Sequence, residues 1–370
     1  MFGEQSEEDE AWNASKRDFL KTVGTVGATG IIGTGVVGAT VRKKRVPKYV
    51  RGDEIIQTMK VPQPWLAQDD KAEAAVEALN RTHFGKDGVL ETGLVRSEQT
   101  FGGWNGFDIE VVVDETQPIP SLPDEVSGVT VRVEKQNPEE RRQQACKNID
   151  DYYNYKEGVN IFDSESGSRH AGTSGYRATK NGNEYMITAA HTFQSTCDVV
   201  EGQATYQYSS QIGNIQGGDV EADFVATDGS SLSGSIVNKV LEPDGTTRNI
   251  SGSASEEEID RRVSDYFDGY TKLGITTGKT TGGLGKKNIT KSSCNDLHGE
   301  GIRGSSDGAN GDSGGPYYSV ENGDAFILGH HIDGQNDKGT VECGGTQTRT
   351  DKSIGMPAFW LVNNRGYTIG

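Results

Sequence analysis

The chain has 370 residues, of which 32% are apolar, and its formal charge of −17 comes from 37 basic and 54 acidic residues. An acidic surface of this size repels phosphate backbones, so the composition argues against a nucleic-acid-binding protein. The 50 glycines favour many short strands and turns over long helices. The length allows two modest domains, each with its own core, in addition to an export segment.

The N-terminal residues resemble an export signal. Residues 15–21, Ser-Lys-Arg-Asp-Phe-Leu-Lys, are similar to a twin-arginine motif with Lys16 in place of the first arginine. The weakly apolar stretch Thr22–Val41 is long enough to span a bilayer, so it predicts a segment that is either removed or kept as a membrane anchor. The basic cluster within Arg42–Arg51 argues against export, because positively charged residues beside a membrane span favour the inside, which would keep the bulk of the chain in the cell. We favour export to the cell surface or extracellular space, because the motif is more specific than a charge count.

Residues 1–45 are expected to be this export signal or membrane anchor, and residues 46–150 form a second block with a different composition. Apolar residues at helical spacing predict a helix over Asp70–Phe84 in this block. Alternating patterns predict strands, and a charged helix follows them; the segments are Val89–Val95, Phe107–Val113, Val129–Val133 and Pro138–Cys146. The block is therefore expected to be a small α+β module that docks on the rest of the chain. It is either a pro-segment that assists folding or blocks the cleft, or a permanent accessory domain.

Residues 158–370 have a different texture, with short β segments between Gly, Ser, Asn and Asp. This pattern predicts a mainly β domain, a barrel or sandwich. The expected strands are Tyr185–Ala189, Thr205–Tyr208, Asp223–Ala226, Ser235–Val240, Gly269–Leu273 and Ala325–His330. The acidic segment Gly252–Ile259 is expected to be a solvated loop.

One glycine-rich segment has the composition that a nucleophile loop needs. In Gly311-Asp312-Ser313-Gly314-Gly315-Pro316 the glycines permit a tight turn in which the Ser313 side chain projects alone. The same turn would point the amides of Gly311 and Ser313 inward as an oxyanion hole. The alternative is an ordinary surface turn, since Asp, Ser and Gly are turn formers.

Two further segments can supply a base and an orienting acid. The strand Ile187–Ala190 ends in small residues, which would deliver His191 to a cleft without crowding it. Asp223 precedes the apolar residues Phe224-Val225-Ala226, so its carboxylate is expected to be buried against the Nδ1 proton of His191. Asp219 and Asp228 stay open as alternatives. Nucleophile, base and acid together predict acyl transfer.

These motifs carry a resemblance to a known family. Thr-Ala-Ala-His ending at His191 and Gly-Asp-Ser-Gly-Gly-Pro around Ser313 resemble the trypsin/chymotrypsin superfamily, with the same order of His, Asp and Ser. The segment Lys272–Gly282 is similar to streptogrisin- and α-lytic-type bacterial proteases. The resemblance covers residues 158–370. It implies a chymotrypsin-like double six-stranded β-barrel and a serine endopeptidase that acts on polypeptides without a cofactor or metal. The acidic composition suggests a salt-adapted archaeal source.

The resemblance also implies roles for residues around the nucleophile. In the bacterial subgroup a basic residue pairs with the acid before the nucleophile, which implies a Lys272–Asp312 ion pair. Asp307 stands where trypsin-like relatives carry the acid that selects Arg or Lys, although Ala309 replaces a cysteine of those relatives and Asp307 can equally be a surface acid. A preference for basic side chains would follow only from the first interpretation.

The segment Gly329–Gly334 matches the family's substrate-pairing strand, so Ile332 and Gly334 are expected to bind an extended peptide through their backbone. His330 and His331 adjoin the cleft, but neighbours on a strand face opposite ways and cannot ligate one metal. No metal is expected.

Four cysteines without a CxxC pair predict two disulfides in an exported chain, with three connectivities open, or else free thiols. Within the resemblance Cys294 and Cys343 bracket the nucleophile loop and are paired, which leaves Cys146 with Cys197.

Two other functions fit the same motifs. A catalytically inert binding protein would keep the barrel without reacting, although the intact set of His191, Asp223 and Ser313 argues against it. An esterase would use the same three residues on a different substrate.

Overall fold

The computed structural model describes residues 41–85, 88–136, 155–157, 160–163, 171–193, 199–207, 210–232, 235–265, 268–291, 297–342 and 346–370. Side chains are described within these ranges except at residues 155–171, 297–299 and 336–349. The export segment, the helix expected at Pro138–Cys146 and all four cysteines lie outside the described residues. No helix in the described ranges combines the length and apolarity needed to cross a bilayer.

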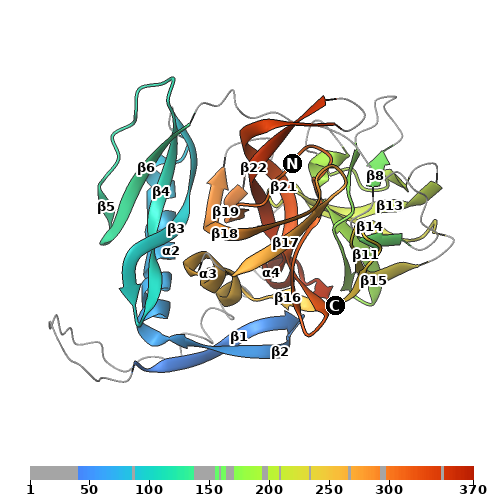
Figure 1. Ribbon diagram of the computed structural model, residues 1–370, viewed down its shortest axis with the longest axis horizontal. Coiled ribbons are helices and arrows are strands. Elements are labelled where there is room, and N and C mark those ends of the chain that lie inside the picture. Colours follow the sequence, from blue (N-terminus) through green and yellow to red (C-terminus); the bar gives the residue numbers. More distant parts are fainter. Residues whose placement is uncertain are drawn as a thin grey trace, which may run out of the picture. The chain divides into compact units, whose positions relative to one another are not determined.

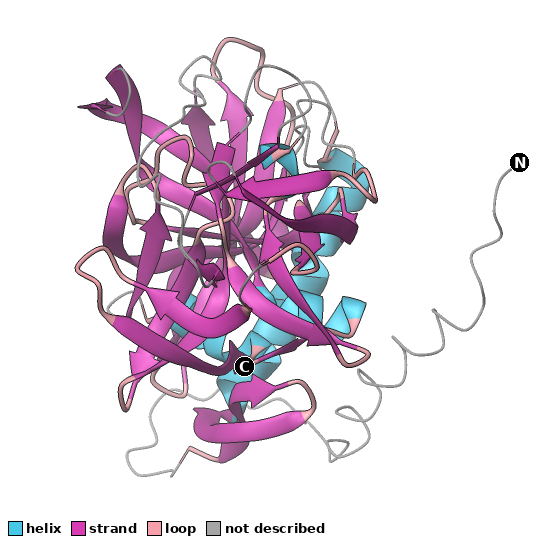
Figure 2. Cartoon of the chain, turned by 90° about the vertical axis from the view of Figure 1, so that its right-hand side faces the viewer, coloured by secondary structure: helices cyan, strands magenta, loops and turns pink. Residues whose placement is uncertain are grey.

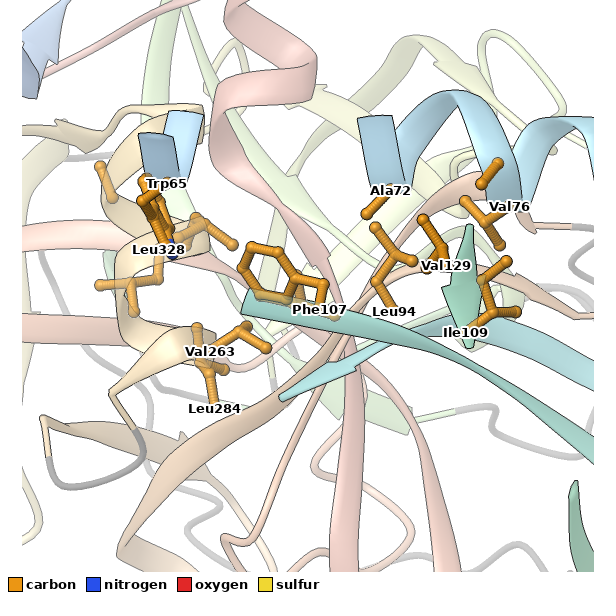
Figure 3. Close-up of a cluster of buried hydrophobic side chains, with 14 of the residues drawn as sticks. Trp65, Ala72, Val76, Leu94, Phe107, Ile109, Val129, Val263, Leu284 and Leu328 are labelled. Atoms are coloured by element: carbon orange, nitrogen blue, oxygen red, sulfur yellow. The ribbon is translucent and has the colours of Figure 1, made fainter. Parts of the chain in front are cut away.

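The module begins with a hairpin and a long helix. Its elements are β1 (Lys43–Arg51), β2 (Glu54–Pro62), α2 (Gln63–His83), β3 (Val89–Phe101), β4 (Trp104–Asp114), β5 (Glu125–Val126) and β6 (Val129–Gln136). The expected helix is confirmed, but it begins at Gln63 because Pro62 and Pro64 suit the first positions of a helix, where amides lack partners. Ala72 and Val76 on α2 face Leu94 and Val129 of the sheet (Figure 3). The helix therefore buries one stripe against the module's strands.

Strands outnumber helices in the described residues after the module. Figure 2 shows that strands also predominate in the described chain as a whole. The first part contains β7 (Tyr155–Glu157), β8 (Asn160–Asp163), β9 (Ala171–Thr173), β10 (Tyr176–Lys180), β11 (Asn183–Thr188), η2 (Ala190–Thr192), β12 (Ala204–Gln207), β13 (Ser210–Asp219), β14 (Phe224–Asp228) and β15 (Ile236–Leu241). The second part contains β16 (Thr247–Ala254), α3 (Glu256–Ser264), β17 (Gly269–Gly274), β18 (Gly278–Lys291), β19 (Leu297–Gly304), β20 (Pro316–Glu321), β21 (Asp324–Glu342), β22 (Thr346–Pro357), α4 (Ala358–Arg365) and β23 (Thr368–Ile369).

These strands form two sheets in the described part of the chain. The smaller has the order β23-β10-β11-β14-β13-β12-β8-β9, and the larger contains β16 to β22. The segment Gly311–Pro316, which the sequence predicts as the nucleophile loop, follows β19 and leads into β20 of the larger sheet, while β14 belongs to the smaller and η2 directly follows β11 of the smaller. The expectation of a mainly β fold with a small α+β module before it is confirmed, because most described elements are strands in two sheets and α2 packs on the strands of the module.

The module and the larger sheet are continuous. β3 pairs antiparallel with β18, and β1 pairs antiparallel with β16, so strands of the module extend the larger sheet at two places (Figure 1). One hydrophobic cluster spans both parts: Phe107 and Leu94 of the module share it with Val263 and Leu284 (Figure 3). The chain accordingly divides into residues 1–41 and a single compact unit of residues 42–370. The blocks distinguished by composition, 46–150 and 158–370, share one sheet and one core.

The prediction of a loop at Gly252–Ile259 was wrong, because this segment is the end of β16 and the start of α3. Ser255 caps the helix by accepting a hydrogen bond from the Glu258 amide at 3.2 Å. The Glu258 carboxylate is fully buried and accepts from Arg261 and Arg262. The run of acids predicts a solvated loop, whereas in the structure the buried Glu258 is satisfied by arginines within the next helical turn.

Candidate active site

The ends of two neighbouring strands carry the predicted base and acid. β11 and β14 pair with Thr188 opposite Val225, so η2, which follows β11, lies beside the residue that precedes β14. His191 Nδ1 lies 2.6 Å from Asp223 Oδ2, and His191 Nε2 lies 2.8 Å from Ser313 Oγ. The structure therefore brings the three predicted side chains into one hydrogen-bonded series.

Asp223 is held rigidly at this point. Its side chain is fully buried, and its backbone has a φ of 45°, a conformation that non-glycine residues seldom adopt. Its Oδ1 accepts from the His191 amide at 3.0 Å, so both carboxylate oxygens contact the same histidine. The alternative acids have other partners: Asp219 pairs with Arg365, and Asp228 accepts from the Asn214 amide.

Two amides beside Ser313 are available to a ligand. Among the described residues, Asp312, Gly314 and Gly315 donate their amides to backbone carbonyls, whereas Gly311 and Ser313 donate to none. Gly311 has a φ of 85°, which the turn requires and which only glycine adopts without strain. These are the two amides that the sequence predicts as an oxyanion hole, which would meet a developing negative charge, and that role stays a prediction.

The nucleophile loop is anchored by a buried ion pair. Lys272 Nζ bonds to Asp312 Oδ2, and both side chains are fully buried. Asp312 also accepts from the amides of Thr276, Thr277 and Ala309 at 3.0 to 3.1 Å. A Cβ at Gly274 would lie 2.0 Å from Asp312 Oδ1, so the small residue makes room for the carboxylate. Burial lowers the pKa of Lys272, while Asp312 opposes that shift.

A small pocket adjoins His191 and Ser313. Its other lining residues are Ala309, Asn310, His331, Ile332, Asp333, Gly334 and Thr350. Ile332 and Gly334 thus lie where they were expected, on β21. Asp307 is half-buried and is not among the described residues that line the pocket; its carbonyl accepts from Thr280 at 3.3 Å.

His331 contributes a polar group to the pocket wall. The His331 Nδ1 atom lies 2.8 Å from the Tyr317 hydroxyl, which itself donates to the Ile354 carbonyl at 3.1 Å. Because the Tyr317 hydroxyl proton is donated to Ile354, the hydroxyl oxygen accepts from His331. Nδ1 of His331 therefore carries the imidazole hydrogen, and Nε2 keeps a lone pair. Burial lowers the pKa of His331 well below its usual value, and the charges of Lys272 and Lys291 add to the effect. Both lysines are paired with acids, Lys272 with Asp312 and Lys291 with Asp333, and Asp333 also lines the pocket.

His330 serves the other side of the strand. Its Nε2 donates to the Asp223 carbonyl at 3.2 Å, and burial lowers its pKa to about 4, although Asp223 opposes the shift. His330 is therefore neutral at physiological pH, and its hydrogen bond holds the backbone of Asp223. Sequence reasoning placed both histidines beside the cleft but missed the contact of His330 with Asp223, because strand alternation showed only that the two rings face opposite ways.

In the described ranges, one cluster of three acidic side chains is close enough together to hold a metal ion: Asp69, Glu73 and Asp260. A lysine ammonium already occupies its centre: Lys287 Nζ lies 2.6 Å from Asp69 and Asp260 and 2.9 Å from Glu73. Burial raises the pKa of Asp260 to about 8, with Glu73 adding to the shift, so this carboxyl is mostly protonated at neutral pH. The cluster lies where the module meets the larger sheet.

Comparison with known proteins gives structural matches only. No family model matches the chain, and no curated protein matches it. A glutamic-acid-specific serine protease described as using a histidine triad in substrate binding has a TM-score of 0.43 and 23% identity, over 58% of this chain and all of that chain. Thermobifida fusca protease A and Nocardiopsis protease each have a TM-score of 0.41 and 18% identity, over 58% of this chain and 97% of theirs.

Proposed function

We propose that the chain is a serine endopeptidase with Ser313 as nucleophile. The observation that carries the proposal is the hydrogen-bonded series from Asp223 through His191 to Ser313, beside the two available amides of Gly311 and Ser313. A binding protein has no need of a hydroxyl 2.8 Å from an imidazole nitrogen whose tautomer a buried acid fixes. The twin-arginine-like residues 15–21 support export of the enzyme.

The geometry supports the following sequence of steps. Ser313 Oγ attacks the peptide carbonyl while its proton passes to His191 Nε2, and the carbonyl electron pair becomes an oxyanion facing the two amides. Asp223 keeps the other imidazole proton on Nδ1 and stabilises the imidazolium. The C–N bond then breaks as His191 protonates the leaving amine. Water hydrolyses the resulting acyl-enzyme by the same proton route in reverse.

The function is tested by an organophosphonate probe that reacts with activated serines. The wild-type chain is expected to be labelled on Ser313 and to cleave an unfolded protein, whereas Ser313→Ala should do neither. A chain that folds but is not labelled would favour the inert-barrel alternative. Labelling with hydrolysis of small esters alone would favour the esterase.

For the residue before the scissile bond, we propose a preference for glutamate over arginine or lysine. The support is chemical: His331 lines the pocket, and because Tyr317 accepts its Nδ1 hydrogen, its Nε2 lone pair is free to take up a proton that an entering carboxylate can accept as a hydrogen bond. An entering carboxylate would also raise the pKa of His331, which would then bind a proton and donate it as a charged hydrogen bond.

Peptides with Glu at this position are therefore expected to be cleaved at least about tenfold faster, by kcat/KM, than peptides with Arg or Lys, a difference of ~1.4 kcal/mol. Because Glu binding takes up a proton at His331, the Glu-to-Gln ratio of kcat/KM should rise as the pH falls from 8 to 6. His331→Leu should reduce both the preference for Glu over Arg or Lys and the pH dependence of the Glu-to-Gln ratio. The Asp307 interpretation predicts the opposite result: a preference for Arg and Lys that Asp307→Asn abolishes.

We also propose that the module is a permanent part of the enzyme and not a discarded pro-segment. The buried lysines Lys286 and Lys287 belong to β18, but most of their carboxylate partners belong to the module. Removing the module would leave these ammonium groups without those partners and expose one side of the shared core. Breaking a buried ion pair from one side costs about 3–5 kcal/mol.

A further inference from the structure

A glutamate of the module reaches the strand that lines the pocket. Glu91 on β3 belongs to the module and is fully buried. Its Oε2 accepts from Gln335 Nε2 at 2.8 Å, across 244 residues of sequence. Gln335 follows Gly334, a residue of the pocket wall.

The Gln335 side chain has both of its polar ends fixed. Gln335 is almost fully buried, and its Oε1 accepts from Arg303 Nη1 at 3.0 Å. Arg303 Nη1 also donates to Glu91 Oε1 at 3.1 Å, which closes a ring of three side chains. An amide held at both ends in a dry site has a single favourable orientation, and breaking one contact leaves a buried polar group unsatisfied.

A second route joins the same glutamate to the pocket. In the pairing of β3 with β18, Glu91 lies opposite Lys291, and the Lys291 ammonium pairs with Asp333 of the pocket wall. Side chains that are directly opposite in adjacent strands are close enough to interact. Glu91 is ionised: burial favours its neutral form, but Lys286 and Arg303 outweigh this and lower its pKa to about 2.

We propose that Glu91 is a positioning residue for substrate binding, which acts through Gln335 and the Lys291–Asp333 pair to hold the backbone of Ile332–Gly334 in the conformation that binds a peptide. The module thereby sets the affinity of the catalytic part for its substrate. This inference rests on the proposed peptidase function, and it gives the module a role in substrate binding that a folding aid would not have.

Glu110 provides a matched control. Its carboxylate also accepts from Lys286 and Arg303, at 3.0 and 2.7 Å, but no described contact joins it to Gln335. Glu91→Gln and Glu110→Gln each remove one charge from the same pair of cations and leave the other carboxylate in place. Glu91 is fully buried and Glu110 is 16% exposed, so Glu91→Gln should cost the fold more, but of the two only Glu91→Gln disturbs the pocket strand.

The test compares these variants in the full chain with a peptide substrate and with the organophosphonate probe. For Glu91→Gln we expect KM to rise about tenfold, with kcat and the rate of probe labelling within about twofold of wild type, since the small probe does not pair with β21. Glu110→Gln should keep the wild-type KM. Gln335→Met removes only the amide, so it should raise KM like Glu91→Gln, and the double variant should be no worse than either.

Gln335→Met decides the question if Glu91→Gln does not fold. Equal KM values for Glu91→Gln and Glu110→Gln in an active enzyme, or a wild-type KM for Gln335→Met, would overturn this inference alone. A wild-type chain that is neither labelled nor able to cleave peptides would overturn the proposed function and this inference with it.

Discussion

Replacing Asp223 by Asn is expected to lower kcat about 10⁴-fold at neutral pH with little change in KM. Asp223 accepts two hydrogen bonds from His191, one from the backbone amide and one from Nδ1. An asparagine amide can donate to Nδ1 and so favours the tautomer with its proton on Nε2. That nitrogen, 2.8 Å from Ser313 Oγ, then has no lone pair to take the serine proton.

The control for this variant is Asp219→Asn, four residues earlier in the same segment. Asp219 bonds to Arg365 and to the Ala222 amide, and no described contact joins it to His191. Its replacement should leave kcat within about twofold of wild type, because its described partners, Arg365 and the Ala222 amide, lie outside the series from Asp223 through His191 to Ser313. Steady-state hydrolysis of a peptide and the rate of probe labelling measure both variants. If Asp219→Asn were the inactive variant, the assignment of the acid would be wrong.

Replacing Lys272 by Met is expected to have the largest effect on stability, about 3–5 kcal/mol in the free energy of unfolding. The Asp312 carboxylate would stay fully buried and lose the only ammonium that the described structure places on it. Three backbone amides would still donate hydrogen bonds to the Asp312 carboxylate, so the variant should still fold, with a lower melting temperature than wild type. Probe labelling should slow as well, because Asp312 lies between Gly311 and Ser313, the two residues whose amides we propose as the oxyanion hole.

Denaturant unfolding and labelling rates check this expectation. The control is Lys279→Met, since Lys279 is 39% exposed and its partner Glu242 keeps Arg248 and Tyr318. That change should cost less than about 1 kcal/mol. The double variant Lys272→Met with Asp312→Asn removes both charges and should recover part of the lost stability. Equal losses for Lys272→Met and Lys279→Met would mean that the buried pair does not anchor the loop.

Most of the fold and much of the candidate site could be predicted because they depend on local patterns. Alternation and turn residues indicated strands that occur as β11, β14 and β17, and helical spacing indicated α2. The glycines and the serine of the nucleophile loop act within six consecutive residues, so a short motif contains the information. The strand end before His191 is equally local.

The role of the charged residues could not be predicted in this way. Glu258 was assigned to a solvated loop but is fully buried between two arginines, and Lys286 looks like any exposed strand lysine in the sequence. Whether such a group is buried depends on a partner that no local pattern names. For Lys286 the partner is Glu91, 195 residues away.

The sequence by itself determined the chemistry that this protein offers: a serine among glycines, a histidine at a small-residue strand end and an acid before an apolar strand. Tertiary structure alone decided the context of that chemistry, namely the pairing of β3 with β18, the shared core of residues 42–370 and the path from Glu91 to the pocket. The physical reason is that periodicity and turn propensity act within a few residues, whereas strand pairing and the burial of ion pairs join residues that only the folded chain brings together.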